Sequence, residues 1–243
     1  MKMMKLPKNE KVVRDGSQNV KLWIYGSPNI GKTTFASQFP DVLMINTDGN
    51  YKYVDSPVVT LVDGANDPWE NFIEITNEIL KGQHEFKTIV VDLLEDVYQY
   101  ARNFYCKKLK IDHESELGYA KGYDIIRNSF LIALRKLANA NYNIIFISHE
   151  ETEVVKDRIG RESTNKKTSL PDKVAKIVAG MVEITGRISC KSKEDENGNI
   201  IDTRILQLAP SKDQFGGNKI PTINIDYVNL GYDDLIKVIK GGK

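Results

Sequence analysis

The segment 26–34 carries the most specific chemical pattern in the sequence. Its residues are Gly26, Ser27, Pro28, Asn29, Ile30, Gly31, Lys32, Thr33 and Thr34. They match the pattern G-x-x-x-x-G-K-[ST] in full, and the two glycines let the backbone turn so that several N–H groups point at one anion. The Lys32 ammonium is expected to reach the β and γ phosphates of ATP, and the Thr33 hydroxyl to bind the Mg²⁺ that bridges them. The pattern therefore predicts a loop that binds ATP with Mg²⁺.

Three more polar side chains follow apolar runs. Asp92 ends the run TIVVD and is predicted to hold Mg²⁺ across from Thr33. Asp48 follows VLMIN closely and is a candidate general base that activates water, although Thr-Asp-Gly-Asn is also good turn chemistry. His149 follows NIIFIS and could sense the γ phosphate, the alternative being a hydrogen-bonded core histidine. Lys32, Asp48 and His149 together form the predicted catalytic set.

Two acids, Glu95 and Asp96, lie one turn beyond Asp92. Carboxylates are favoured in the first turn of a helix because they face the positive end of its dipole. We therefore expect both to be solvated residues without a catalytic role.

The first 150 residues alternate between strand-like and helix-like patterns. Mostly apolar runs typical of buried strands occur at 20–25, 42–46, 58–62, 88–91 and 143–148. Helical spacing is found at 32–38, 69–80, 93–110 and 119–138. This alternation predicts an α/β fold with a mainly parallel central sheet flanked by helices.

The pattern changes after His149. A polar stretch of mixed charge covers 150–173, and a short helix is predicted at 174–179. Two strands, 181–189 and 200–208, are joined through Asn197-Gly198, a strong hairpin turn signal. A loop at 211–219, a short strand at 223–225 and a helix at 232–239 complete the prediction.

Length and composition are those of one globular domain. The chain has 243 residues, 41% hydrophobic residues and a formal charge of +1. We expect a flexible basic arm at 1–16 and a single domain at 17–243, with a core at 20–190 and a carboxyl-terminal hairpin and helix at 190–243. The charge argues against a strongly basic coat protein and a polyacidic tail, but a local basic groove remains compatible with it.

Several protein classes are not supported. The two cysteines, Cys106 and Cys190, are far apart and accompany no metal-binding pattern. The sequence contains neither a signal-peptide pattern at its start nor an apolar run of about 18 residues. We expect a protein that does not enter membranes and acts in the cytoplasm.

The order of these motifs is similar to that of the RecA-like ATPase core. Three stretches more closely resemble phage-encoded RecA-like ATPases that act as single-strand annealing recombinases: YGSPNIGKTTFASQFP, GYAKGYDIIRNSFLIALRKL, and IIFISHE followed by KIVAGMVE. The resemblance implies a RecA-like P-loop NTPase fold with a carboxyl-terminal β-hairpin extension. It also implies that Asp48 is the catalytic carboxylate, that Asp92 ends the Walker B strand, and that a mobile loop at 151–173 contacts single-stranded DNA.

Two departures from that family pattern carry predictions. Asp48 stands where RecA carries Glu, and the shorter side chain predicts slow turnover because catalytic geometry is sensitive at the ~1 Å scale. His149 stands where a glutamine is usual, which predicts a pH-dependent coupling between nucleotide and DNA.

Basic residues provide candidate DNA contacts. The stretch after His149 contains Lys156, Arg158, Arg161, Lys166 and Lys167, and the alternative for them is a solvated surface hairpin. A second candidate is the helix segment 98–110, where Tyr98, Arg102 and Tyr105 share one side. Its alternative is a helix that packs its aromatic residues inward and turns its lysines outward.

A ring or filament would place ATP between subunits, where a neighbour could supply a cation to the γ phosphate. Lys212 and Lys219 are candidates by location only, the alternative being ordinary surface lysines.

Three functions remain open. The first is a Mg²⁺-dependent ATP-binding and ATP-hydrolysing protein that binds single-stranded DNA and promotes annealing or recombination in phage DNA metabolism. The second is a nucleotide-gated adaptor or loader in phage replication with little hydrolysis, and the third a small-molecule kinase. Expected partners are single-stranded DNA, further copies of the chain and a single-strand-binding protein, in the cytoplasm of an infected or lysogenic bacterial host.

Overall fold

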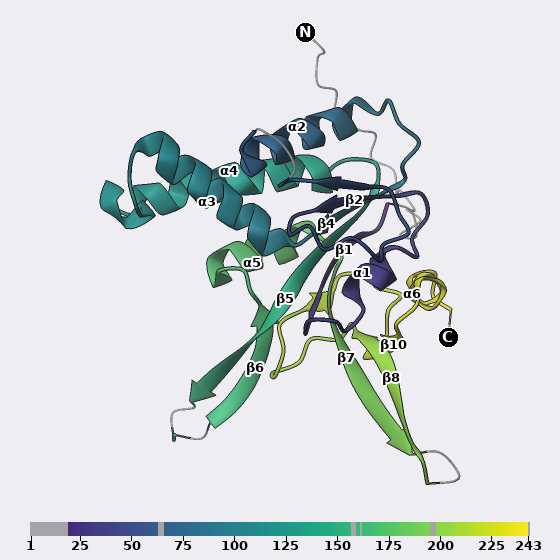
Figure 1. The fold of residues 1–243 in the computed structure, drawn as a ribbon. Helices are drawn as coiled ribbons and strands as arrows, with labels where there is room; N and C mark the ends of the chain where they lie inside the picture. The colour runs from purple at the N-terminus through teal and green to yellow at the C-terminus, as the bar shows by residue number, and fades with distance from the viewer. Residues whose placement is uncertain (1–18, 63–65, 157–158, 161, 195–197, 243) are drawn as a thin grey trace, which may run out of the picture.

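The computed structural model describes residues 19–62, 66–156, 159–160, 162–194 and 198–242 (Figure 1). Within these described residues, ten strands form one sheet. They are β1 (Lys21–Gly26), β2 (Val42–Asn46), β3 (Val58–Thr60), β4 (Thr88–Asp92), β5 (Asn143–Lys156), β6 (Glu162–Thr168), β7 (Ile184–Glu194), β8 (Ile200–Gln207), β9 (Gly217–Asn218) and β10 (Tyr227–Asn229). The helices are α1 (Lys32–Ala36), α2 (Pro68–Lys81), α3 (Leu94–Leu109), α4 (Lys121–Ala138), α5 (Asp172–Met181) and α6 (Tyr232–Ile239), with a 3₁₀ turn, η1 (Glu114–Leu117).

The centre of the sheet is parallel. Its order is β10-β8-β7-β1-β5-β4-β2-β3, and the strands from β7 to β3 run in the same direction. Strands β8 and β10 are antiparallel to their neighbours. The predicted α/β class with a mainly parallel sheet is confirmed. Because β1 lies between β5 and β7, its carboxyl end opens near the centre of the sheet, where open α/β sheets bind ligands.

Helices cover both faces of this sheet. Helices α2, α3, α4 and α5 pack on one face, over a core that includes Trp23 and Phe146. Helices α1 and α6 pack on the other face, over a core that includes Ile24 and Ile147. Successive strand residues therefore face opposite cores, which explains why the central strands are continuous apolar runs.

Helix α2 shows how local sequence sets an element's bounds. The Asp67 side chain caps the helix by accepting a 2.9 Å hydrogen bond from the backbone N–H of Trp69, and Pro68 occupies the first turn. Gly82 ends the helix with a left-handed φ of 68°.

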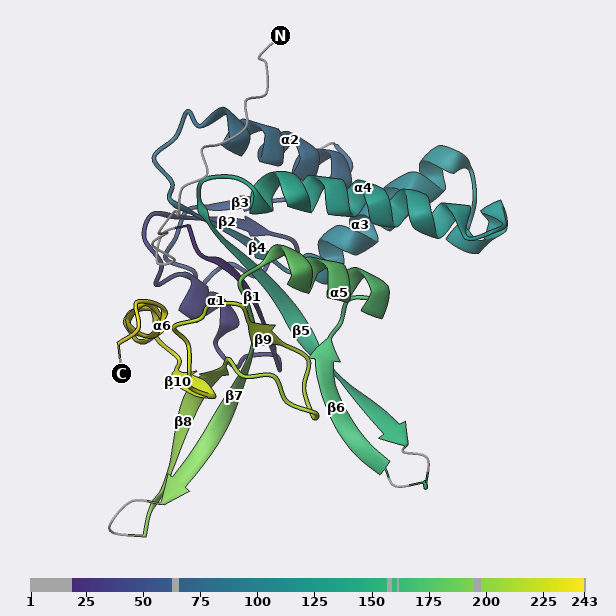
Figure 2. The ribbon, with the colours of Figure 1, turned by 180° about the vertical axis from the view of Figure 1, so that it is seen from behind.

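Two long ribbons leave the body of the protein on the same side (Figures 1 and 2). One is β5 paired with β6, and the other is β7 paired with β8. The first corrects a prediction, because most of the described part of the stretch expected as a mobile loop at 151–173 forms antiparallel strands, with 151–156 paired to 162–167. The pairing places Val154 opposite Thr164 and Lys156 opposite Glu162, and β-branched and opposite-charge pairs stabilise such a ladder.

The carboxyl-terminal segment differs from prediction in one strand. The expected strand at 223–225 is not a strand, and β10 begins at Tyr227 instead. Ile223 is buried in the core beneath α6, so its apolar character reflects packing rather than strand pairing. In the described part of the chain, no helix is both long enough and apolar enough to cross a membrane.

Candidate nucleotide-binding site

The phosphate-binding loop connects β1 to α1. Gly31 stands at the start of α1 with φ of 100°, a left-handed conformation that favours glycine. A Cβ on Gly26 would lie 2.7 Å from the carbonyl oxygen of Ile188, so glycine is also required where β7 passes. The buried Lys32 Nζ donates to the carbonyl oxygens of Gly26 (2.9 Å) and Ser27 (3.0 Å). Burial lowers the pKa of Lys32, although nearby carboxylates counteract it.

The two predicted Mg²⁺ ligands are in contact. Thr33 Oγ1 donates a 2.7 Å hydrogen bond to Asp92 Oδ2. Burial raises the pKa of Asp92 to about 6, against the lowering effect of that hydrogen bond. A carboxylate and a hydroxyl side by side are hard oxygen ligands that suit Mg²⁺, and a bound cation would offset the burial of the charge. The donors present therefore fit Mg²⁺.

Asp48 lies near this pair but is already held by its own loop. Its carboxylate accepts from Asn50 N (2.9 Å), Asn50 Nδ2 (2.8 Å) and Asn46 Nδ2 (3.0 Å). Burial raises the pKa of Asp48, but these hydrogen bonds outweigh it and leave that pKa lowered. Asp48 thus makes the turn contacts that were the alternative to its catalytic role. Its lowered pKa means that the carboxylate is ionised but weakly basic.

His149 lies beside the loop because β5 pairs with β1, which brings His149 opposite Gly26. Its ring Nδ1 lies 3.0 Å from Glu95 Oε1, and its backbone N–H donates to the same oxygen at 2.7 Å. The expectation that Glu95 and Asp96 are solvated is wrong. The Glu95 side chain is 16% exposed, and Asp96 accepts a 2.6 Å hydrogen bond from Thr47 Oγ1. Neither acid lines the pocket itself, but Glu95 contacts His149 and Asp96 contacts Thr47, which precedes Asp48.

One pocket of about 720 Å³ brings these groups together. Its lining includes Lys32, Thr33, Asp48, Asp92 and His149, together with Pro28, Asn29, Thr34, Ser37, Gly49, Asn50 and the segment 52–55. The volume lies within the range of about 300–1,000 Å³ found for small-molecule sites. All residues of the predicted catalytic and metal-binding sets therefore line one pocket.

Sequence reasoning missed an exposed aromatic residue in this pocket. Tyr53 lines its wall and is 90% exposed. An exposed aromatic ring beside a phosphate loop offers a surface on which a base can stack. The signal was present in the sequence as the pair of tyrosines in YKY, shortly after Asp48.

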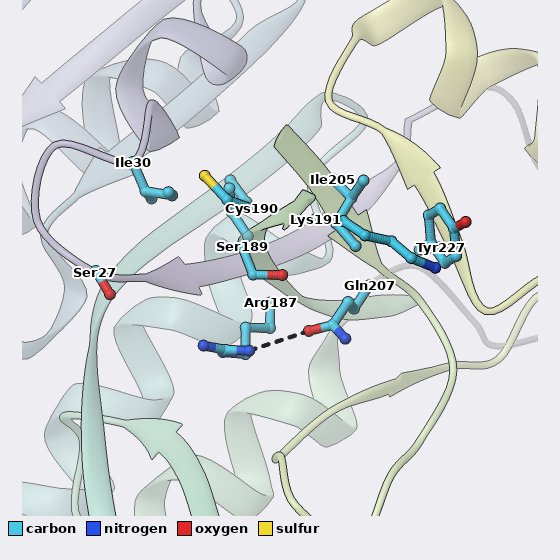
Figure 3. Close-up of a pocket in the computed structure, with 10 residues that line it drawn as sticks. Ser27, Ile30, Arg187, Ser189, Cys190, Lys191, Ile205, Gln207 and Tyr227 are labelled. Carbon is cyan, nitrogen blue, oxygen red and sulfur yellow. Dashed lines mark hydrogen bonds between the residues drawn. The ribbon is translucent and has the colours of Figure 1, made fainter. Parts of the chain in front are cut away.

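A second cavity, of about 440 Å³, lies on the other flank of the loop (Figure 3). Its lining combines Ser27 and Ile30 of the loop with Arg187, Lys191 and Tyr227 of the carboxyl-terminal strands. Lys191 Nζ lies 4.0 Å from the centre of the Tyr227 ring, a cation–π contact.

Another basic residue of the same ribbon approaches the loop directly. A Cβ on Gly31 would lie 3.1 Å from Arg204 Nη1, so this guanidinium lies against the phosphate loop. It was not found from the sequence, because its position depends on the β7–β8 pairing.

The described residues of the predicted DNA-contact set are engaged in ion pairs. Lys156 pairs with Glu162 at 2.9 Å, Lys166 with Glu150 at 3.2 Å, and Lys167 with Glu153 at 3.3 Å and Asp172 at 3.1 Å. Arg158 and Arg161 lie outside the described residues. This arrangement is the hairpin alternative, with cations whose charge is partly balanced within the ribbon.

The second DNA candidate, on α3, is a packed helix face. The Tyr98 ring packs edge-on against Phe130 of α4 at 5.1 Å between centroids. Lys108 lies over the rings of Phe104 and Tyr105. The aromatic residues of α3 thus support the helical layer, while the lysines are exposed.

The two candidate trans cations have different environments. Lys219 Nζ donates to three carbonyl oxygens at the end of α5, those of Ala179 (2.9 Å), Gly180 (2.8 Å) and Val182 (2.7 Å). It acts as a helix cap within its own chain, and this geometry speaks against the trans role predicted for it. Lys212 is exposed and keeps its candidacy.

One protein-family profile matches most of the chain. The sequence profile described as AAA domain matches residues 18–220. The chain belongs to the AAA domain family. Together with the complete phosphate-loop motif, this membership supports nucleotide binding by a P-loop NTPase.

Similar individual proteins are distant. The "SPbeta prophage-derived uncharacterized protein YorG" of Bacillus subtilis (strain 168) is 22% identical over 146 residues, which cover 57% of this chain and 43% of that protein. This AAA-domain chain thus aligns with less than half of that relative's length. Among solved structures, the flagellar accessory protein FlaH from Methanocaldococcus jannaschii is similar with a TM-score of 0.44 and 11% identity, over 87% of this chain and 84% of that one.

Proposed function

We propose that this chain is a Mg²⁺-dependent ATPase that binds single-stranded DNA and promotes annealing or recombination in phage DNA metabolism. The observation that carries the ATPase part is the pocket in which Lys32, Thr33, Asp92, Asp48 and His149 converge. Similarity to a prophage-derived protein supports the phage setting.

Strand β5 offers a path between nucleotide and DNA. His149 lines the pocket, and the same strand continues as one arm of the β5–β6 ribbon. A ligand that moves His149 would therefore displace the root of the ribbon, which is how an ATP-dependent change in DNA affinity would arise.

The ribbon lysines must exchange partners to bind DNA. The pair between Lys156 and Glu162 has both side chains more than 60% exposed. Exposed pairs contribute only about 0–1 kcal/mol, so phosphate groups can compete with Glu162 for this lysine. This favours electrostatic binding that falls steeply with salt.

A stacking surface is available at the tip between α3 and α4. Gly118, Tyr119 and Ala120 all have left-handed φ values, of 62°, 46° and 59°. They hold the Tyr119 side chain 99% exposed. An aromatic ring presented in this way, beside the exposed Lys121, fits the bases and phosphates of a single strand.

Assembly into a ring or filament is part of the proposal. Lys212 would then act on the γ phosphate of a neighbouring copy, and a single-strand-binding protein is a candidate partner on the DNA.

The test is ATP turnover with and without single-stranded DNA at low salt, using Lys32→Ala as the inactive control. Stimulation by DNA supports the proposal. Turnover that does not respond to DNA of any length would refute the DNA part.

The adaptor function is the second candidate, and the hydrogen bonds that already hold Asp48 favour it. An Asp48→Ala variant separates the two. Loss of turnover supports the ATPase, whereas unchanged slow turnover with intact DNA binding supports an adaptor.

A further inference from the structure

The first turn of α3 joins the two strand ends on either side of Asp92. Asp92 is paired with Asn46 of β2 on one side and Ile147 of β5 on the other. In the first turn of α3, Glu95 contacts His149, which lies beyond Ile147, and Asp96 contacts Thr47, which lies beyond Asn46. The same turn therefore holds one residue just beyond each strand end that flanks the metal-binding carboxylate.

Glu95 holds His149 by two atoms. Its Oε1 accepts from the backbone N–H of His149 and also lies within hydrogen-bond distance of ring Nδ1. The backbone contact fixes the position of the residue, and the Nδ1 contact fixes the plane of the ring. A carboxylate at Nδ1 also sets the tautomer and leaves Nε2 for a ligand.

Asp96 makes the matching contact on the other side. Thr47 Oγ1 donates to Asp96 Oδ2 and accepts from the backbone N–H of Leu93 at 2.8 Å. Since Thr47 precedes Asp48 directly, this contact anchors the loop that carries Asp48.

We propose that Glu95 is a positioning residue of the nucleotide site, which holds the His149 ring in the orientation that meets the γ phosphate. The inference rests on the proposed ATPase function. It gives a role to Glu95, which is not among the residues that the sequence motifs assign to the site.

The second oxygen of Glu95 argues for a functional rather than a purely structural role. Glu95 Oε2 is buried and has no hydrogen-bond partner among the described residues. Leaving a buried polar atom unpaired costs about 1–3 kcal/mol, so a residue retained for stability alone would be expected to satisfy both oxygens.

The contact between Glu95 and His149 can be measured through the pKa of His149. The hydrogen bond from Glu95 raises the pKa of His149, while burial and Lys32 lower it and Asp96 raises it. Glu95 and Asp96 come from α3, and Lys32 comes from α1. Removing the charge of Glu95 should therefore lower the pKa of His149.

The first measurement is proton NMR titration of the free protein. The chain has three histidines, so the His149 signal is assigned by its loss in His149→Gln. In Glu95→Gln the His149 midpoint should fall relative to wild type, and in the control Glu70→Gln, which removes an exposed acid from the first turn of α2, it should not move. An unchanged midpoint in Glu95→Gln would overturn the proposal.

The second measurement is steady-state ATP turnover with nucleotide affinity measured in parallel. Glu95→Gln should lower kcat by about 10- to 100-fold while the affinity for a fluorescent ATP analogue stays within about twofold, since a misplaced group affects reaction geometry more than binding. Adding Glu95→Gln to His149→Gln should cause no further fall. A wild-type kcat, or an independent further fall in the double variant, would refute the positioning role.

Two safeguards keep these outcomes distinct. If Glu95→Gln does not fold, the test uses His149→Gln in the otherwise intact chain. This variant must lower kcat while its affinity for the ATP analogue stays unchanged. A kcat equal to that of wild type would overturn the proposal. If the wild-type protein shows no turnover under any condition, the proposed ATPase function fails, and the NMR titration then decides the Glu95 contact alone.

Discussion

The same Gly→Ala change is predicted to have opposite effects in two helices. In α4, a Cβ on Gly122 would lie 2.2 Å from the carbonyl oxygen of Glu114 and 2.9 Å from its Cα. In α5, a Cβ on Gly180 would meet nothing within 4 Å. Both glycines are helical, so the difference lies in the space around them.

The magnitudes follow from packing and helix propensity. Alanine in place of glycine in a helix stabilises by about 0.5–1 kcal/mol, which is the expected gain for Gly180→Ala. In Gly122→Ala this gain is outweighed, because η1 must move away and overpacking costs about 1–3 kcal/mol. Glu114 cannot move freely, since its carboxylate pairs with Arg102 at 2.6 Å and is only 9% exposed. We expect a net loss of about 1–2 kcal/mol.

Thermal and urea unfolding of the two variants test this. In a domain of this size, 1 kcal/mol shifts Tm by about 2–4 °C, so Gly122→Ala should melt several degrees below wild type and Gly180→Ala slightly above it. A Gly122→Ala variant as stable as wild type would contradict the close approach of α4 to η1, and a loss of stability in Gly180→Ala would contradict the open space around Gly180.

Two further predictions concern charged contacts. Lys219→Met should lower the free energy of unfolding by about 1–2 kcal/mol through loss of the α5 cap, measured by urea unfolding, whereas Lys212→Met should leave it unchanged; equal stabilities would contradict the cap. Glu150→Gln should destabilise by about 1–3 kcal/mol at neutral pH, because Glu150 is 5% exposed and pairs with Arg187 at 2.6 Å and with Lys166. Burial raises the pKa of Glu150, but these two cations lower it below its ordinary value of 4.5, so the stabilisation is present above pH 4.5 and lost as the pH falls through the lowered value. Urea unfolding at several pH values should show that the difference in free energy of unfolding between wild type and Glu150→Gln becomes smaller in acid. A difference that does not change with pH would contradict this prediction.

The nucleotide site could be predicted largely from local sequence. The phosphate loop is set by consecutive residues, and Asp92 and His149 end runs of buried strand residues whose neighbours in the sheet follow from the α/β pattern. Residues at the ends of parallel strands meet at one edge, so their convergence needs no knowledge of side-chain contacts.

The contacts that were missed depend on tertiary packing. Glu95 follows Asp92 closely in sequence, but its role depends on how α3 packs against the end of β5. Arg204 reaches Gly31 because β8 pairs with β7, some 170 residues after the loop. The ribbon of 150–156 and 162–168 was only the alternative to a mobile loop, because its polar side chains lack the apolar alternation of a half-buried strand, and cross-strand pairs stabilise it instead.

Equilibrium binding of a fluorescent ATP analogue, with and without Mg²⁺, tests most directly whether Lys32, Thr33 and Asp92 form a Mg²⁺–nucleotide site. Wild-type protein should bind the analogue more tightly with Mg²⁺. Lys32→Ala should weaken binding by about tenfold or more, a loss of ~1.4 kcal/mol, while Lys81→Ala at the exposed end of α2 should not. Asp92→Asn should remove the dependence on Mg²⁺. Equal affinities for wild type and Lys32→Ala, with no effect of Mg²⁺ on either, would contradict the assignment of this pocket.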